Sequence, residues 1–341
     1  MVIELSRRQF LGRMGVLYGA VSAGPVLWIR PAASASMPLA PRIGWGADPR
    51  TTLTVSWATD GPVRNPVVDF GVDDGFGRLL PAVGNHEIET GMGASGYDGF
   101  LTRIALPGNG LAGLPTTWSA RWCNVALVAA DANDVSTEIT RNNGVSGGGQ
   151  DAWLERTLAG LRGDPAVDWI VVGFHHCAYC TNTLHGSDAG VRRWAPLFDR
   201  YGVDLVINGH NHCYERTHPV RAEAPVAEVA SGGTWASTGG VTYLCAGGGG
   251  GQTFPMSVAP LSTVTVEGGA RIPERAPWSA FRYNDHSLLL IDVEPPGAGG
   301  ATTLTVRAVS AAGAEFDRLT LLRRRDRAAG AEPPAAGRPA A

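Results

Sequence analysis

Lysine is absent from this chain, so all 28 of its basic residues are arginine. The absence excludes a P-loop lysine, a Schiff-base lysine and a Ser-Lys dyad as the basis of its function. A strong excess of charge is lacking too, because 31 acidic residues leave a formal net charge of −3. We therefore expect neither nucleic acid nor a polyanionic partner to bind the protein.

Cysteine is sparse and odd in number, with thiols at Cys123, Cys177, Cys180, Cys213 and Cys245. In an oxidising compartment at least one of these thiols stays unpaired. The CxxC pair at Cys177 and Cys180 fits a zinc site with nearby histidines, a disulfide, or simple packing. Because the second CxxC pair of a zinc ribbon is lacking, we do not favour a structural zinc site.

The sequence also lacks an N-terminal apolar run that is long and continuous enough to span a membrane. The stretch 14–29 is mildly apolar, interrupted by Gly and Pro, and follows Arg7-Arg8, while Ala33-Ser34-Ala35 offers a small-residue cleavage site. We interpret residues 1–35 as a twin-arginine signal peptide rather than a membrane anchor. The mature protein is then expected in the periplasm, in the cell envelope or outside the cell, without stable membrane association.

What is present divides into two patterns. Short alternating runs at 52–57 and 66–71 predict strands, but residues 36–78 are too few to complete a β-sandwich of about 100 residues. From residue 79 onward, apolar strands at 125–130, 169–174 and 203–208 alternate with helices predicted at 150–161 and 191–201, the second ending at Gly202. Further strand-like runs occur at 242–246, 287–293 and 302–309. The order predicts an α/β (α+β) fold in which ligands bind at the carboxyl ends of the strands.

Residues 324–341 are expected to be disordered.

A GxSxG match at residues 144–148 suggests a serine hydrolase. The preceding residues are polar and do not form a strand, so the strained nucleophile turn lacks its context and we attribute the match to chance.

Three polar segments carry the informative chemistry. They are Gly84-Asn85-His86-Glu87, then His175 directly after the strand at 169–174, and Gly209-His210-Asn211-His212 directly after the strand at 203–208. His and Asn donors suit iron, zinc or manganese rather than calcium or magnesium. Histidines two positions apart can address two neighbouring ions, and such a pair activates a water for phosphoryl displacement.

The GNHE, VxxH and GHxH blocks, followed by Tyr214-Glu215-Arg216-Thr217, resemble those of the purple acid phosphatases in the calcineurin-like metallophosphoesterase superfamily. The resemblance implies a metallophosphoesterase-type β-sandwich flanked by helices over residues 79–323, preceded at 36–78 by a fragment of a fibronectin-III-like β-sandwich.

The resemblance also assigns roles within the site. Asn85, His175 and His210 would ligate one divalent ion, zinc or manganese, and His212 would ligate a companion ferric ion. His86 would contact the substrate phosphate, and His185 would contact the phosphate or donate a proton, the alternative for His185 being a place in a solvent-exposed loop. Glu87 and Arg216 would orient ligands, and His176 would not be a ligand.

The sequence departs from the family before GNHE, where the DxG and GDxxY blocks supply two Asp ligands and the Tyr ligand. The letters of DxG occur at residues 69–71 and 73–75, but they lie too close to Asn85 for a helix to intervene, and we interpret them as turns. We predict that a block of about 100 residues is missing, that one zinc or manganese ion binds weakly, and that phosphomonoesters are hydrolysed slowly without the purple tyrosinate absorption. The alternative is a secreted, non-catalytic metal-binding or degenerate relative. The sequence gives no prediction of oligomeric state.

Overall fold

The computed structural model describes residues 81–88, 93–102, 104, 106–237, 239–296 and 300–324, together with the backbone of five N-terminal strands. These strands are β1 (Val2–Ser6), β2 (Leu27–Arg30), β3 (Leu39–Trp45), β4 (Thr52–Ala58) and β5 (Val67–Phe70).

The N-terminal strands form two small antiparallel sheets. One has the order β1-β4-β3, and the other pairs β2 with β5. The strands predicted at 52–57 and 66–71 are confirmed as β4 and β5. Asp69, interpreted from sequence as a turn residue, lies in β5, whereas the second DxG match at 73–75 lies outside the described residues. Of the predicted signal peptide, the structure describes only β1 and β2, and of the predicted disordered tail only Arg324.

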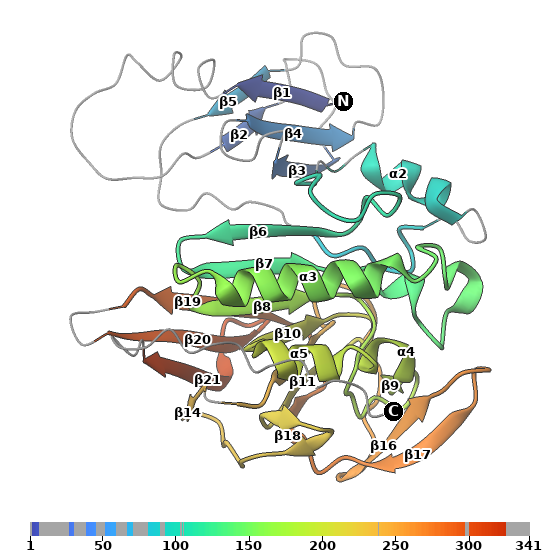
Figure 1. Cartoon of the computed structure of the whole chain (residues 1–341), viewed down its shortest axis with the longest axis vertical. Coiled ribbons are helices and arrows are strands. Elements are labelled where there is room, and N and C mark those ends of the chain that lie inside the picture. Colours follow the sequence, from blue (N-terminus) through green and yellow to red (C-terminus); the bar gives the residue numbers. More distant parts are fainter. Residues whose placement is uncertain are drawn as a thin grey trace, which may run out of the picture.

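A seven-stranded mixed sheet forms the centre of the molecule (Figure 1). Its inner strands β7, β8, β10 and β15 are parallel to one another, as the alternation of strands and helices predicted. Antiparallel strands extend it on both sides. In spatial order the strands are β18 (Ser279–Tyr283), β11 (Tyr214–Thr217), β15 (Thr242–Ala246), β10 (Leu205–Asn208), β8 (Trp169–Gly173), β7 (Val125–Ala129) and β6 (Trp118–Trp122).

Helices cover one face of this sheet. The longest is α3 (Gly149–Gly163), whose buried side chains Trp153, Leu154 and Leu158 pack in a core with residues of β7, β8 and β10. The helix predicted at 191–201 is divided into α4 (Ala189–Arg192) and α5 (Ala195–Tyr201). Pro196 stands in the first turn of α5, where its missing N–H is tolerated, whereas inside one continuous helix it would break a hydrogen bond. The remaining helices are α2 (Asp98–Leu101) and the 3₁₀ turns η1 (Gly93–Tyr97), η2 (Ala132–Asp134) and η3 (Thr140–Asn142).

A four-stranded sheet packs against the other face. Its order is β14-β21-β20-β19, and its side chains Leu304, Val306 and Leu319 share a buried core with Trp169 and Leu205 of the seven-stranded sheet. The strands are β14 (Gly233–Ala236), β19 (Ser287–Glu294), β20 (Ala301–Ser310) and β21 (Glu315–Arg324). Two packed sheets with helices on one outer face confirm the predicted α/β fold class, although the helices are few.

Small sheets complete the described part of the chain. The order β17-β16-β9 joins Arg271–Arg275, Leu261–Thr265 and Ser187–Asp188, and β12 (Val220–Arg221) pairs with β13 (Ala224–Pro225). Within the described residues, no helix has the length and apolar character that a membrane crossing requires.

Candidate metal centre

Three parallel strands of the central sheet lead into one group of polar side chains. The chain leaving β7 reaches Glu138, the chain leaving β8 reaches His175, and the chain leaving β10 reaches His210. Because neighbouring parallel strands end at the same edge of a sheet, these residues meet there. The position is the one that the sequence predicted for the ligands.

Asn85, His175 and His210 bring three donor atoms together. Asn85 Oδ1 lies 2.8 Å from His175 Nε2, and His175 Nε2 lies 3.3 Å from His210 Nδ1. Neighbouring ligands held about 2.1 Å from one ion are separated by roughly 3.0–3.4 Å. Both separations are close to those of neighbouring ligands on one metal ion, and the three residues are those that the sequence placed on the divalent ion.

The protonation state of His175 suits this role. Burial, aided by the neighbouring histidines, lowers the pKa of His175 to about 3. The ring is therefore neutral near neutral pH, and the neutral imidazole is the form that binds a metal.

Glu138 belongs to the site although the sequence analysis missed it. Its Oε2 lies 3.1 Å from His210 Nε2, and its Oε1 lies 2.5 Å from His185 Nδ1. Burial opposes ionisation, but hydrogen bonds with His185 and His210 lower the pKa of Glu138 to about 2, so it is a carboxylate. A carboxylate that accepts the Nε2 proton of His210 leaves the Nδ1 lone pair directed at the ion.

His185 lies in this group rather than in a separate loop position. Its ring centroid is 4.3 Å from that of His210, and Glu138, His185 and His210 each offer a ligand atom within 4.8 Å of the others. The trio could hold an ion by itself. Alternatively, Glu138 fixes both rings, and His185 Nε2 then stays available to a substrate, as the sequence predicted.

The other predicted residues lie around the ligand atoms and make separate contacts. His86 is exposed beside the site, near enough to contribute to the lowered pKa of His175. Glu87 accepts a hydrogen bond from the Gly84 N–H at 2.9 Å and so closes the turn that carries Asn85. His212 lies near enough to contribute to the lowered pKa of His175 as well, but its Nδ1 lies 2.6 Å from the Gln252 carbonyl oxygen and its ring stacks on Phe254. Among the described residues, no group of His, Cys, Asp and Glu side chains with metal-ligand spacing includes His212.

Two predicted roles can be compared with the observed contacts. His176 is fully buried against His210 and belongs to neither of the metal-binding groups found among the described residues. Arg216 is wrongly predicted to orient ligands, because its guanidinium is buried between the two sheets. It donates to Asp317 at 2.7 and 3.1 Å.

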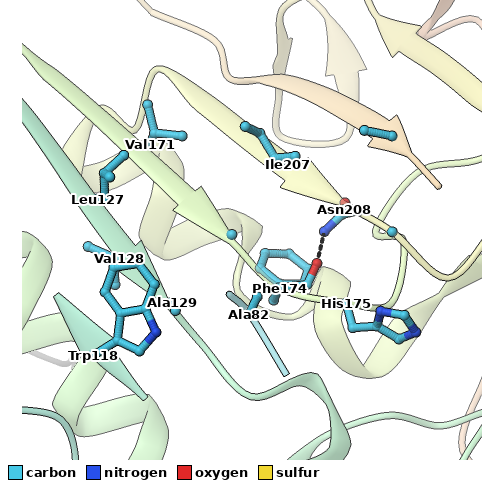
Figure 2. Close-up of a pocket in the computed structure, with 13 residues that line it drawn as sticks. Ala82, Trp118, Leu127, Val128, Ala129, Val171, Phe174, His175, Ile207 and Asn208 are labelled. Carbon is cyan, nitrogen blue, oxygen red and sulfur yellow. Dashed lines mark hydrogen bonds between the residues drawn. The ribbon is translucent and has the colours of Figure 1, made fainter. Parts of the chain in front are cut away.

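A cavity of about 310 Å³ opens beside His175 (Figure 2). Its floor is the apolar face of β7, β8 and β10, represented by Leu127, Val171 and Ile207. Asn208 donates a hydrogen bond to the Phe174 carbonyl oxygen at 3.0 Å, which ties the ends of β8 and β10 together below the histidines.

Comparisons with known proteins agree with this geometry. Residues 58–214 match the calcineurin-like phosphoesterase family. An uncharacterized protein of Mycobacterium tuberculosis strain H37Rv is 35% identical over 274 residues, covering 71% of this chain and 51% of that protein. Purple acid phosphatase 15 of Arabidopsis thaliana is 32% identical over 149 residues, covering 42% of this chain and 26% of that protein. The structure of purple acid phosphatase PPD1 from yellow lupin (Lupinus luteus) seeds has a TM-score of 0.53 at 20% identity, covering 71% of this chain and 40% of that one.

The chain therefore carries a calcineurin-like phosphoesterase domain. Purple acid phosphatases are among the proteins to which the chain is similar, in sequence for the Arabidopsis relative and in fold for the lupin structure, in line with the three sequence blocks. The chain spans about half the length of the mycobacterial relative and less of the plant one.

Proposed function

We propose that this protein hydrolyses phosphomonoesters at a metal centre held by Asn85, His175 and His210. The observation that carries the proposal is the convergence of Asn85 Oδ1, His175 Nε2 and His210 Nδ1 at the spacing of one ligand set. Zinc or manganese suits these nitrogen and amide-oxygen donors. A bound ion would act as a Lewis acid toward the phosphoryl group and activate a water for attack.

The protein's own residues bind and orient the substrate. His86, exposed beside the centre, and His185 Nε2 contact the phosphate, and His185 supplies a proton to the departing oxygen. The Glu138 carboxylate accepts hydrogen bonds from His185 Nδ1 and His210 Nε2, which fixes the orientation of both rings. Glu138 is thus a positioning residue.

We further propose that turnover is slow compared with that of the family. His212 is the one residue assigned to the companion ferric ion, and its Nδ1 lies against a backbone carbonyl oxygen. If iron does not bind there, the chain carries no purple tyrosinate absorption. A secreted, non-catalytic metal-binding protein is the second candidate, favoured by this isolated position of His212.

We propose the twin-arginine route for export, with the mature protein in the periplasm, in the cell envelope or outside the cell. Its partner is a small phosphomonoester and not nucleic acid, as the near-neutral charge indicates.

The test combines bound manganese or zinc with p-nitrophenyl phosphate hydrolysis in the wild type and in a His175→Ala, His210→Ala double variant. We expect the double variant to lose both one bound ion and all metal-dependent turnover. A His286→Ala variant is the control, because that ring contacts the Gly248 carbonyl oxygen outside the ligand set. Turnover that survives in the double variant would refute the proposed centre, and bound metal without hydrolysis of any phosphoester would select the non-catalytic candidate.

A further inference from the structure

Four of the five cysteines form one buried cluster next to the histidine centre. Cys177 and Cys180 lie in the loop after β8, Cys213 directly precedes β11, and Cys245 lies within β15. None of the four is more than 1% exposed. Three separate segments of the chain therefore deliver thiols to one place in the interior.

The sulfur atoms have the spacing of a metal-ligand set. Cys180 Sγ lies 3.8 Å from Cys213 Sγ, which lies 3.9 Å from Cys245 Sγ. The Sγ atoms of Cys177, Cys180 and Cys245 all lie within 4.8 Å of one another. A tetrahedron of thiolates about 2.3 Å from zinc has edges of roughly 3.8 Å.

Packing alone is a weaker explanation of this cluster. A buried thiol behaves as a small apolar group, and apolar packing alone gives no reason for three sulfurs to gather within 4.8 Å of one another with a fourth 3.8 and 3.9 Å from two of them. Cys177 and Cys180 are separated by two residues, which is the C-x-x-C spacing found in structural zinc sites. The pair taken alone was an insufficient signal in the sequence, and the fold supplies the missing partners, Cys213 and Cys245.

We propose that Cys177, Cys180, Cys213 and Cys245 bind a structural zinc ion, in a site separate from the histidine centre. Four thiolates fill the tetrahedral shell of zinc and leave no position for substrate, so the ion would have no catalytic part. The proposal does not depend on the proposed phosphatase activity.

The cluster lies where it can fix both ligand-bearing loops. Cys177 follows His175 by two positions, and Cys213 follows His212 directly. In the structure the Cys177 thiol donates a hydrogen bond to the Gly209 carbonyl oxygen (3.2 Å) and the Cys245 thiol donates one to the Asn211 carbonyl oxygen (3.1 Å), so both sulfurs lie beside the turn that carries His210. Zinc binding would replace the two thiol protons. A zinc ion here would join the loop after β8, the turn after β10 and strand β15.

The experiment uses the full chain purified without chelators or reductant. A mercurial reagent titrates the thiols while an indicator dye records released zinc, and X-ray absorption at the zinc edge reports the ligands. We expect one sulfur-bound zinc per chain, with sulfur at about 2.3 Å, released only as the buried thiols react, in addition to any zinc held by the histidine centre. The same zinc should persist in the His175→Ala, His210→Ala variant, which separates this outcome from failure of the histidine centre.

Variants give the matched comparison. Cys180→Ser should lose the sulfur-bound zinc, whereas Cys123→Ser should keep it, because Cys123 is exposed and outside the cluster. Should Cys180→Ser fail to fold, the wild-type absorption spectrum decides the matter. Three results for the wild type would overturn the proposal. They are disulfides among these cysteines in non-reducing peptide mapping, four free thiols without zinc, and iron bound in place of zinc.

Discussion

At the scale of single residues, the site depends on a side chain that carries no motif. Glu138 contacts His185 and His210, which lie far along the chain, and its carboxylate is stabilised by both rings. Its neighbours in sequence show no ligand pattern, so only the folded chain reveals it. By contrast, Asn85, His175 and His210 were predictable, because each follows a short recognisable block.

Replacing Glu138 tests whether it orients His210. Glu138→Gln keeps the shape of the side chain but removes the charge that holds the His210 Nε2 proton, and we expect metal affinity to fall by roughly 10–100-fold. Competition with a metal-binding dye measures the change. Glu155→Gln is the control, since that carboxylate pairs with Arg200 at the exposed surface of α3. Equal affinities in wild type and Glu138→Gln would contradict the assigned role.

Asp131 should make stability depend on pH. This fully buried carboxyl accepts hydrogen bonds from Thr116 and from the backbone of Asn133, yet burial raises its pKa from 3.8 to about 6. A raised folded-state pKa favours the protonated fold, so its stabilisation is complete below about pH 4 and is lost as pH rises through 6.

The variant Asp131→Asn lacks this titration. We expect its stability relative to wild type to increase by about 2.4 kcal/mol between pH 4 and pH 7. Urea unfolding of both proteins across this range measures the difference. Parallel pH profiles would show that the Asp131 pKa is not raised in the fold.

At the scale of elements, the buried strands, the longest helix and the strands β19 and β20 were predictable from the sequence, whereas β6 and β21 were not. β7, β8, β10 and β15 are mostly apolar because both faces of the central sheet are covered. β6 contains a serine and an arginine, and β21 contains arginines and acidic residues, which alternate imperfectly with apolar residues; such strands acquire their identity from pairing with a neighbour. Likewise, the cysteine cluster requires β15 to lie beside β10, which no local pattern indicates.

The turn between β10 and β11 carries backbone strain at a ligand. His210 has a φ of 55°, a left-handed conformation that costs a residue with a side chain roughly 1–2 kcal/mol. We therefore expect His210→Gly to be more stable than His210→Ala by about 1 kcal/mol, although both lack the ligand. Urea unfolding in metal-free buffer makes the comparison. A less stable glycine variant would mean that another contact, rather than strain, dominates at this turn.

At the scale of the whole molecule, a buried ion pair joins the two sheets. Arg216 of β11 donates two hydrogen bonds to Asp317 of β21, and Tyr214 donates a third to the same carboxylate at 2.6 Å. Removing one partner of a buried pair leaves the other charge without compensation and costs roughly 3–5 kcal/mol.

We expect Asp317→Ala to lose about that much stability, and an Arg216→Met, Asp317→Leu double variant to recover roughly 2 kcal/mol of it. Denaturant unfolding measures both changes. The exposed pair of Arg307 and Asp292 provides the control, since Arg307→Met should cost less than about 1 kcal/mol. A double variant no more stable than Asp317→Ala would show that the pair is needed for more than charge compensation.

The distances along the chain between the ligands have a thermodynamic consequence. Asn85 and His175 are 90 residues apart in sequence, and Glu138 and His210 are 72 residues apart. An unfolded chain does not hold such distant donors together, so a metal ion selects the native state and stabilises it by mass action, by about 2.7 kcal/mol at a hundredfold excess over its dissociation constant. The melting temperature of the protein should thus report the concentration of free metal around it.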